Sequence, residues 1–372
     1  MSGILRYLRA LSFIALAWVI FSSGIGCSSS VDSPSASARL AEDLDQIRLS
    51  QGEGWGLIVP GMSAALLSAN QSGELIAAAT GTADPPEAVP LTRTDRFHMG
   101  SITKTFTAAL ILQLVQEGRL ELGDPISSWI SYPGGESITI EMVLGHTSGV
   151  PNFNELPGFS PDLTPLQSIA LAAKQPLQFP PGSDWAYSNT NYTILGVIAE
   201  SLTEMSWSTL LDERFFEPLG LTDTYVFTGE PQAPTIIGSR LDCGFPNEPE
   251  CVKRPGFSLI PVTNGFDWVV AWSAGAIVST PSDMAKWIKA LTTGEVLNTA
   301  HTQLMMTASP QSRRVLSEQP TYGTMRWTGC GLGLLEYEFE GHGTGWGHEG
   351  AITGFVANAV HMNVSGKTFA FA

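Results

Sequence analysis

Basic residues are scarce in this chain. Of its 372 residues, 19 are Lys or Arg and 35 are Asp or Glu, which gives a formal net charge of −16 at pH 7. An acidic chain repels the phosphate backbones of DNA and RNA, and the sequence holds no cluster of Lys and Arg that would attract an anionic membrane. We therefore expect neither a nucleic-acid partner nor a membrane surface bound through basic side chains.

Apolar runs long enough to cross a membrane are also missing. Leu11 to Phe21 is an apolar run near the N-terminus, but it is too short for a transmembrane helix. Arg6 and Arg9 precede this run and small residues follow it, which is the pattern of an export signal. We expect residues 1–26 to be a signal peptide that directs a bacterial protein out of the cytoplasm.

Cys27 ends the run Gly24-Ile25-Gly26-Cys27 and precedes a Ser-rich stretch. The arrangement resembles the processing site of a bacterial lipoprotein, although an aliphatic residue is usual where Gly24 stands. We expect a lipid on Cys27, a tether over residues 27–38, and a periplasmic or cell-surface lipoprotein that reaches the membrane only through this anchor. The alternative is an ordinary cleaved signal that happens to contain a cysteine.

Cysteine is rare as well, with four residues in the chain. Export implies an oxidising compartment, in which Cys243 and Cys251 could close a small disulfide within a Pro- and Asn-rich loop. Cys330 would then be left as a buried free thiol, and the sequence leaves this pairing open.

Spacings of Cys and His that are typical of a zinc site do not occur. Glu340, His342, His348 and Glu349 are close in the sequence, but their Gly-rich spacing gives them no helical register. We therefore expect no metal site.

The order of apolar patterns predicts a mixed α and β fold. Ala38 to Leu49 is typical of an amphipathic helix, Met62 to Leu67 and Glu74 to Thr80 of a β-hairpin, and Thr103 to Glu117 of a longer helix. Helix and loop patterns fill the middle third. From Ala274 onward the pattern predicts strands again.

The C-terminal hundred residues contain one predicted helix among several predicted strands. The helix spans Pro281 to Leu291, with Thr280 as its N-cap and the proline at its first position. The predicted strands are Ala276 to Ser279, Gly331 to Leu335, Ile352 to Met362 and Thr368 to Ala372.

Strands at both ends and helices in the middle predict an α/β fold of the α+β type. We expect an antiparallel sheet from the N- and C-terminal segments, flanked by helices, with an inserted mainly helical lobe. The expected domain covers residues 39–372, with a sheet lobe at about 55–110 and 270–372 and a helical lobe at about 111–269.

Ser101 and Lys104 form the first candidate site. Residues three apart on a helix share a face, so the Lys104 amine can lie beside the Ser101 hydroxyl at the start of the predicted helix. A serine hydroxyl needs an adjacent base to act as a nucleophile. A lysine can be that base when burial and nearby positive potential, such as a helix N-terminus, lower its pKa. The alternative is an exposed helix start with a solvated lysine.

Tyr187-Ser188-Asn189 is the second candidate. Tyr187 can relay a proton between a nucleophile and a leaving group, and Asn189 can hydrogen-bond a substrate carbonyl. The alternative is a tyrosine that only packs, with Asn189 or Thr190 as the cap of a helix predicted from Tyr192 to Leu202.

Gly347-His348-Glu349-Gly350-Ala351 is the third candidate. Glycines beside a strand, such as Gly350, allow a ligand to approach the backbone closely. The backbone N–H of Ala351, together with that of Ser101, is a candidate donor to an oxyanion. The alternative is a Gly-rich turn that carries a surface histidine.

These motifs occur together in an order that is more specific than any one of them. In sequence order they are Phe97-His98-Met99-Gly100-Ser101-Ile102-Thr103-Lys104-Thr105-Phe106, Gly145-His146-Thr147-Ser148-Gly149, Tyr187-Ser188-Asn189-Thr190-Asn191-Tyr192, Ser273-Ala274-Gly275, Gly331-Leu332-Gly333-Leu334 and Gly347-His348-Glu349-Gly350. From about residue 55 to its end the chain resembles the serine β-lactamase-related family. That family comprises class C β-lactamases, D-alanyl-D-alanine carboxypeptidases and β-lactamase-like esterases, and the Streptomyces-type carboxypeptidase is the nearest in pattern.

The resemblance implies a β-lactamase/transpeptidase-like fold and a serine hydrolase that forms a covalent acyl-enzyme on Ser101. Lys104 and Tyr187 would share the acid–base work, Asn189 would orient the substrate, and His348 would stand where β-lactamases carry lysine and carboxypeptidases histidine. It also implies no cofactor and a small-molecule or short-peptide acyl substrate. We expect a monomer, and a chain that lacks the C-terminal helix of its relatives because it is a fragment.

Three positions depart from the carboxypeptidase pattern. Where carboxypeptidases of this type hold the substrate carboxylate with an arginine and two hydroxyls, an ungapped alignment places Leu335, Glu349 and Ala351. An ionised Glu349 would repel a carboxylate, so we expect a neutral ester, lactone, amide or a cationic substrate. The alternative is that Glu349 faces solvent and Arg326 or Lys367 replaces the missing cation.

Three further hypotheses stay open in the sequence. A D-alanyl-D-alanine carboxypeptidase or a β-lactamase is the first, and a penicillin-binding sensor that acylates without turnover is the second. In the third, Ala271-Trp272-Ser273-Ala274-Gly275 acts as the nucleophile elbow of an α/β-hydrolase, but it lacks the first glycine of that motif. We therefore expect Ser273 to be structural or to line the substrate site.

Overall fold

The computed structural model describes most of the chain from residue 35 onward. The described residues are 35–55, 59–69, 73–84, 87–229, 236, 238–241, 259–262, 269–319, 321 and 325–372. The predicted signal peptide, Cys27, Cys243 and Cys251 lie outside them, so the lipid anchor and the disulfide stay predictions. Within the described residues, no helix is both long enough and apolar enough to span a membrane.

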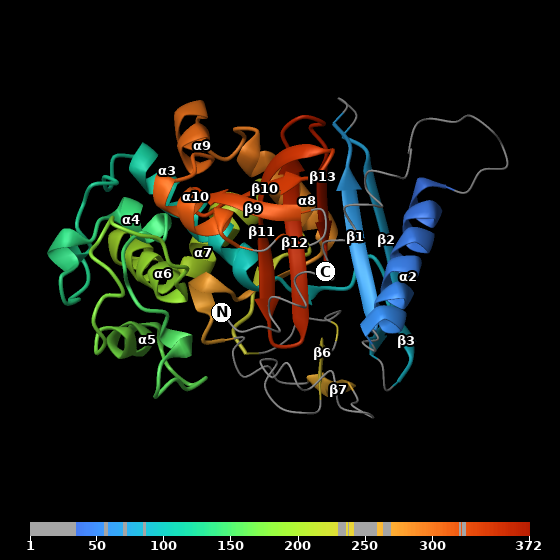
Figure 1. The fold of residues 1–372 in the computed structure, drawn as a ribbon, viewed down its shortest axis with the longest axis horizontal. Helices are drawn as coiled ribbons and strands as arrows, with labels where there is room; N and C mark the ends of the chain where they lie inside the picture. The colour runs from blue at the N-terminus through green and yellow to red at the C-terminus, as the bar shows by residue number, and fades with distance from the viewer. Residues whose placement is uncertain are drawn as a thin grey trace.

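The strands at the two ends of the sequence pair in one eight-stranded antiparallel sheet, as predicted (Figure 1). Strand β1 pairs with β2 on one side and with the last strand, β13, on the other, so that Ala64 lies opposite both Ala78 and Phe371. In the order of the sheet the strands are β3 (Val89–Pro90), β2 (Leu75–Asp84), β1 (Gly61–Leu67), β13 (Thr368–Phe371), β12 (Phe355–Met362), β11 (Gly343–Ile352), β10 (Leu335–Phe339) and β9 (Met325–Cys330).

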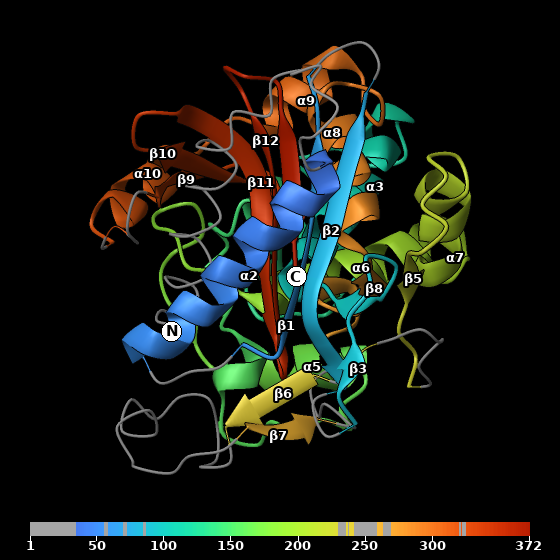
Figure 2. The ribbon, with the colours of Figure 1, turned by 90° about the vertical axis from the view of Figure 1, so that its right-hand side faces the viewer.

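Helices cover both faces of this sheet, because successive residues of its strands place apolar side chains on opposite faces. In β1, Leu66 packs in a cluster with Leu44 of α2 (Ala36–Trp55), whereas its neighbour Leu67 packs in the cluster of the opposite face. Helix α2 lies across β1 and β2 in Figure 2. On the opposite face, α8 (Pro281–Thr292) contacts β1, β12 and β13.

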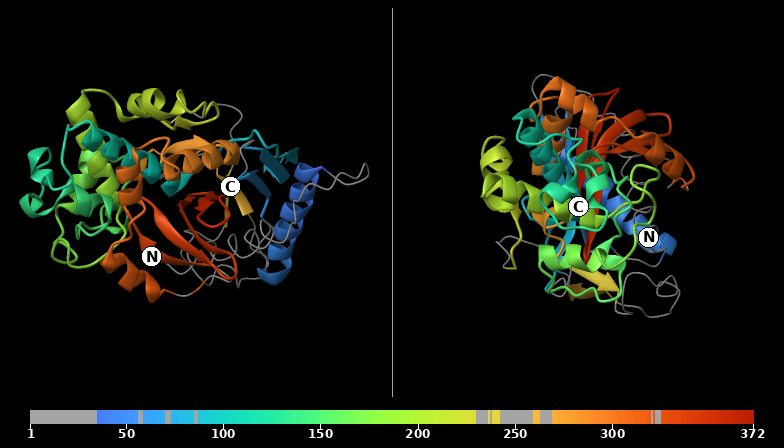
Figure 3. Two further views of the ribbon diagram at one scale, coloured as in Figure 1. Left: turned by 90° about the horizontal axis from the view of Figure 1, so that it is seen from above. Right: turned by 90° about the vertical axis from the view of Figure 1, so that its left-hand side faces the viewer.

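Further helices lie beyond the sheet, at the end of the molecule away from α2 (Figures 1 and 3). They are α4 (Ile140–Leu144), α5 (Pro165–Ala172), α6 (Asn189–Thr203) and α7 (Trp207–Leu211). Near the sheet lie α3 (Thr103–Gln116), α9 (Thr299–Met305) and α10 (Pro310–Ser317). Two small sheets complete the strands: β4 (Phe97–His98), β8 (Ile277–Ser279) and β5 (Tyr225–Val226) form one, and β6 (Gly238–Leu241) and β7 (Leu259–Val262) the other.

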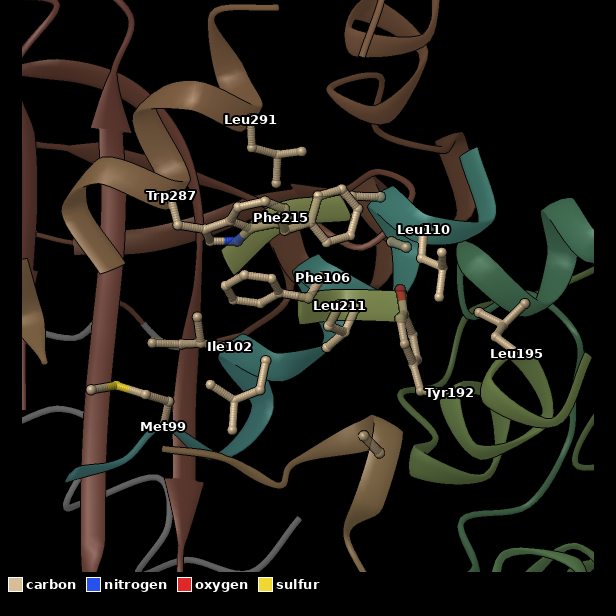
Figure 4. Close-up of a cluster of buried hydrophobic side chains, with 14 of the residues drawn as sticks. Met99, Ile102, Phe106, Leu110, Tyr192, Leu195, Leu211, Phe215, Trp287 and Leu291 are labelled. Atoms are coloured by element: carbon tan, nitrogen blue, oxygen red, sulfur yellow. The ribbon is translucent and has the colours of Figure 1, made fainter. Parts of the chain in front are cut away.

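The buried helix α3 fixes the segment that carries Ser101. Phe106 of α3 stacks on Trp287 of α8, with ring centroids 3.8 Å apart and an interplanar angle of 7° (Figure 4). The indole N–H of Trp287 also donates to Thr105 Oγ1 at 2.7 Å. Strand β4 pairs with β8 and is joined to α3 by a short 3₁₀ turn, Gly100–Ile102. The N-terminus of α3 is therefore held by this strand on one side and by Trp287 on the other.

We expect Trp287→Ala to lower the free energy of unfolding by about 3–5 kcal/mol, because it leaves a large cavity beside Phe106. Urea denaturation measures this loss, and Leu166→Ala is the control. Leu166 is 62% exposed, so its truncation should change stability by less than about 0.5 kcal/mol. A Trp287→Ala variant with the stability of the control would show that this aromatic stack does not support the fold.

Local predictions succeed where the chain carries a clear cap and fail where glycines interrupt an apolar run. Thr280 Oγ1 accepts the N–H of Asp283 at 3.2 Å and Pro281 opens α8, as predicted. The strand predicted at Gly331–Leu335 is wrong, because residues 331–334 turn the chain between β9 and β10, with Gly333 at φ +89°. The strand at Gly343–Ile352 was not predicted apart from its last residue, because its four glycines weaken the alternating pattern.

Candidate active site

Ser101 and Lys104 lie side by side at the start of α3. Ser101 stands in the 3₁₀ turn and is partly exposed, whereas Lys104 is fully buried. The Lys104 amine and the Ser101 hydroxyl share a hydrogen bond with Nζ 3.0 Å from Oγ. The structure therefore brings together the two residues that the spacing of the first motif singled out.

A backbone carbonyl holds the other side of the lysine amine. Lys104 Nζ donates to Ala274 O at 2.7 Å, and Ala274 belongs to a 3₁₀ turn, Trp272–Ala274. A neutral amine has two N–H groups and one lone pair. With one N–H directed at Ala274 O, the lone pair can accept the Ser101 proton, which is the geometry that a general base needs.

Tyr187 joins this pair from the segment before α6. Its ring centroid lies 5.0 Å from Lys104 Nζ and 6.2 Å from the ring centroid of His348. Three of the predicted motifs therefore meet around the Ser101 hydroxyl, although more than 240 residues separate Ser101 from His348.

Asn189 is the first residue of α6 and is partly exposed. Its side-chain N–H donates to Asn154 Oδ1 at 2.9 Å, and its backbone N–H donates to Asn152 Oδ1 at 3.0 Å. The alternative in which Asn189 or Thr190 caps the helix is wrong. Ser188 holds the N-cap position without a side-chain cap bond, and Thr190 Oγ1 donates instead to Pro151 O at 2.6 Å.

The edge of β11 lies against the turn that carries Ser101. Strand β10 pairs with β11 only up to Gly347, so the segment from His348 to Ile352 continues beyond it. A side chain at Gly350 would collide with the carbonyl of Met99 and its Cβ would lie 3.3 Å from the backbone nitrogen of Ser101. Only glycine permits this approach, and it brings β11 to the reactive serine.

Two backbone N–H groups flank the serine as a result. A Cβ on Gly100 would lie 2.9 Å from the backbone nitrogen of Ala351, so this nitrogen is adjacent to the Gly100–Ser101 peptide. N–H groups of Ser101 and Ala351 in this arrangement can stabilise negative charge on a substrate carbonyl oxygen.

His348 and Glu349 point to opposite faces of the sheet because strand residues alternate. His348 lies opposite Ala359, in the cluster that faces α3 and α8, and is 3% exposed. Glu349 lies opposite Asn358 on the other face and is 5% exposed, so the alternative of a solvent-facing Glu349 is wrong. The expectation that it repels a carboxylate stays a prediction.

Leu335 and the two proposed substitute cations lie apart from His348. Leu335 packs in the α2-side cluster with Cys330 and Tyr337. Arg326 forms an ion pair with Glu338 at 2.5 Å on the outer strands of the sheet. Lys367 follows the turn after β12, which is the opposite end of that strand from the β11–β12 turn near Ser101.

Ser273 and Cys330 are buried and serve the packing. Ser273 Oγ donates to the carbonyl of Tyr192 at 2.9 Å and its side chain fills the space beside Gly196, so the nucleophile-elbow hypothesis is wrong and the structural expectation is confirmed. Cys330 is a buried free thiol, as expected. Burial raises the pKa of Cys330 to about 12, which keeps it protonated and unreactive.

Metal ligands do not gather in the described residues, where no group of three or more His, Cys, Asp or Glu side chains is placed to hold an ion. The sequence cluster that ends in His348 and Glu349 is divided between the two faces of the sheet.

The sequence did not identify two groups that contact the candidate active-site residues. The Ala274 carbonyl is a backbone group, so its side chain gives no signal of its contact with Lys104. His146 stacks on Tyr187 with ring centroids 4.5 Å apart. The Gly145–Gly149 motif was visible, but a pattern of residues does not reveal which side chain its histidine contacts.

Residues 56–372, which include this whole site, match the sequence profile described as Beta-lactamase. The chain belongs to the β-lactamase family. The predicted membership and the predicted fold class are both confirmed. Together with the serine–lysine arrangement, membership makes the chain a serine hydrolase of the group that includes β-lactamases and penicillin-binding proteins.

Curated proteins match the chain over different lengths. Penicillin-binding protein 4 of Amycolatopsis lactamdurans is 28% identical over 306 residues, which are 80% of this chain and 76% of that protein. Protein flp of Staphylococcus aureus strain N315 is 29% identical over 218 residues, which are 56% of this chain but only 41% of that protein.

Solved structures match nearly the whole chain. A D-stereospecific amidohydrolase from Streptomyces sp. is 27% identical with a TM-score of 0.70, covering 91% of this chain and 94% of that one. A D-amino acid amidase from Ochrobactrum anthropi SV3, complexed with L-phenylalanine amide, is 26% identical with a TM-score of 0.73 and covers 89% of both chains.

Proposed function

We propose that this β-lactamase family member hydrolyses neutral esters and neutral or cationic amides, which have no carboxylate next to the scissile bond, through a covalent acyl-enzyme on Ser101. The 3.0 Å contact between Lys104 Nζ and Ser101 Oγ beside the Tyr187 ring carries the proposal. The positions at which carboxypeptidases of this type carry an arginine and two hydroxyls also support it. They hold Leu335, Glu349 and Ala351, which supply neither a cation nor a hydroxyl, and Leu335 and Glu349 face away from His348.

Acylation begins with attack of Ser101 Oγ on the substrate carbonyl carbon while its proton moves to the Lys104 amine. The N–H groups of Ser101 and Ala351 stabilise the oxyanion. Tyr187 then passes a proton to the leaving alcohol or amine as the C–O or C–N bond breaks, and Lys104 restores the tyrosine proton. A water molecule attacks the acyl-enzyme in the same manner, which releases the acid and returns the proton to Ser101.

Amides of amino acids are the amide substrates that we favour. Two structural relatives are described as a D-amino acid amidase and a D-stereospecific amidohydrolase. An amino acid amide carries a cationic amine and no carboxylate next to the scissile bond, so it needs no arginine at the Leu335 position. Asn189 would orient such a substrate through its amide group.

Three alternative activities remain candidates because of one relative. Penicillin-binding protein 4 of Amycolatopsis lactamdurans supports a carboxypeptidase, a β-lactamase or a non-turnover penicillin-binding sensor. A sensor would retain a β-lactam on Ser101 without releasing it, whereas a hydrolase would release the product.

We also propose that the protein is an exported bacterial monomer. The N-terminal signal pattern and Cys27 support export and a lipid anchor. The acidic net charge of −16 supports the absence of a nucleic-acid partner.

A hydrolysis panel tests the substrate class. We expect p-nitrophenyl esters and amino acid amides to give kcat/KM values at least about tenfold above those of nitrocefin and of a D-Ala-D-Ala peptide, since the carboxylate contacts are missing. The Ser101→Ala variant is the control for background hydrolysis. If the D-Ala-D-Ala peptide is the best substrate, the interpretation of Leu335, Glu349 and Ala351 is wrong.

A further inference from the structure

His146 adopts a backbone conformation that is rare for its residue type. Its φ is +59°, in the left-handed region, and its side chain is 1% exposed. A residue other than glycine persists in this region only where its surroundings hold it there, and such residues cluster at functional sites. Contacts of the loop after α4 with the rest of the protein must therefore hold the His146 backbone in this conformation.

The loop is joined to the segment that carries Tyr187. The backbone N–H of Ala186 donates to the His146 carbonyl at 3.0 Å, and that of Gly182 donates to the Thr147 carbonyl at 2.8 Å. On the far side of Tyr187, the backbone N–H of Ser188 donates to the ring nitrogen Nδ1 of His146 at 3.1 Å. His146 thus binds the residues immediately before and after Tyr187.

These bonds identify the protonation state of the imidazole. A backbone N–H can only donate, so His146 Nδ1 is an acceptor, and a neutral ring then carries its proton on Nε2. The side-chain N–H of Asn191 also approaches Nδ1, at 3.3 Å. Burial first, and then the nearby Lys104 and His348, lower the pKa of His146 well below its ordinary value. The ring therefore remains neutral at pH 7.

The ring also lies against the phenol itself. The centroids of the His146 and Tyr187 rings are 4.5 Å apart with an interplanar angle of 30°. Tyr187 is held at its ring by this stack and at its two flanking residues by the bonds of His146, with Lys104 Nζ 5.0 Å from the ring centroid.

We propose that neutral His146 is a positioning residue that fixes the Tyr187 phenol between Lys104 and His348. The inference rests on the acid–base role proposed above for Tyr187. A different side chain at residue 146 would loosen the phenol and change its distance from Lys104, which is positively charged once it has taken the Ser101 proton. The titration of Tyr187 depends on that distance.

Titratable groups reach Tyr187 or its immediate surroundings from four elements. They are Lys104 of α3, His146 of the loop after α4, Tyr192 of α6 and His348 of β11. Because the other three stay in place in a His146 variant, a shift in the alkaline limb of the pH profile reports a displaced phenol.

The variant His146→Asn separates this role from support of the fold. Asparagine tolerates the left-handed region and its Oδ1 can accept the Ser188 N–H, but it has no ring to stack on Tyr187. With a neutral p-nitrophenyl ester we expect kcat to fall by about tenfold to hundredfold, because a displaced Tyr187 would lose part of the rate that an acid–base group contributes. KM should change by less than about threefold. The alkaline limb of the pH profile of kcat should move by about one pH unit, which is the shift expected when the distance between the Tyr187 phenol and the protonated Lys104 changes.

Three further measurements complete the test. Thr147→Val, an isosteric change at the next residue, should keep the pH limbs of the wild type. Nitrogen NMR of the imidazole in the wild-type enzyme should show a neutral ring protonated on Nε2 at pH 7. Tyr187→Phe should abolish the alkaline limb, and if it does not, the acid–base role of Tyr187 fails rather than the inference alone.

A folded His146→Asn enzyme with wild-type kcat and pH limbs, alongside a Tyr187→Phe enzyme that has lost them, would overturn the inference and leave the proposed function intact. A protonated ring at pH 7, or a ring protonated on Nδ1, would overturn it even if the variant does not fold.

Discussion

Replacing Ser101 by alanine lowers kcat/KM for every hydrolysed ester or amide by at least about 10⁴-fold, because removing a nucleophile leaves only the oxyanion donors and substrate binding. The hydroxyl projects from a 3₁₀ turn at the start of α3 and is partly exposed, so its removal does not disturb the core. The wild-type enzyme should be labelled by a fluorophosphonate, whereas the variant should stay unlabelled and keep its melting temperature within a few degrees, about 0.5 kcal/mol of stability.

Ser317→Ala is the matched control for this variant. Ser317 is an exposed residue of α10 whose hydroxyl donates to its own helix, at the carbonyl of Arg314. It should retain full activity and full labelling. Labelling of Ser101→Ala at another serine, with activity retained, would mean that the nucleophile has been assigned to the wrong residue.

Replacing Lys104 gives the second large effect and tests the base separately from the nucleophile. Lys104→Met keeps the length of a fully buried side chain but removes the amine, so no group accepts the Ser101 proton. We expect kcat/KM to fall by about 10³–10⁴-fold, in the range of a general base, and the rate of fluorophosphonate labelling to fall with it.

Lys104→Arg distinguishes a base from a positive charge. A guanidinium stays protonated in proteins, so it preserves the charge but cannot accept a proton. We expect Lys104→Arg to be as inactive as Lys104→Met. An arginine variant with more than about a tenth of wild-type activity would show that the lysine acts through its charge, as an electrostatic group and not as a base.

Sequence patterns identify the parts of this fold that have local causes. The hairpin of β1 and β2 follows from two apolar runs separated by turn residues, and α8 from Thr280 and Pro281 at its start. The pairing of the first and last strands follows from their place in the order of elements, since strands at both ends can share one sheet when helices fill the interval.

Contacts between distant segments explain what the patterns could not give. Strand β11 has the composition of a turn because Gly350 must pass close to Met99 and Ser101, and this requirement exists only in the folded chain. Likewise, the carbonyl of Ala274 reaches Lys104 across 170 residues of sequence. Alternation along β11 separates Glu349 from His348, which the sequence alone treats as neighbours in one motif.

A rapid-mixing experiment with mass spectrometry tests whether Ser101 is the acylated nucleophile. The enzyme is mixed with p-nitrophenyl acetate, quenched at successive times and digested to locate the acyl group. We expect one acetyl group per chain, attached to Ser101, which appears with the first turnover and disappears as the substrate is consumed. Steady hydrolysis with no covalent species, an acetyl group on another residue, or an acetyl group that never leaves Ser101 would contradict this expectation.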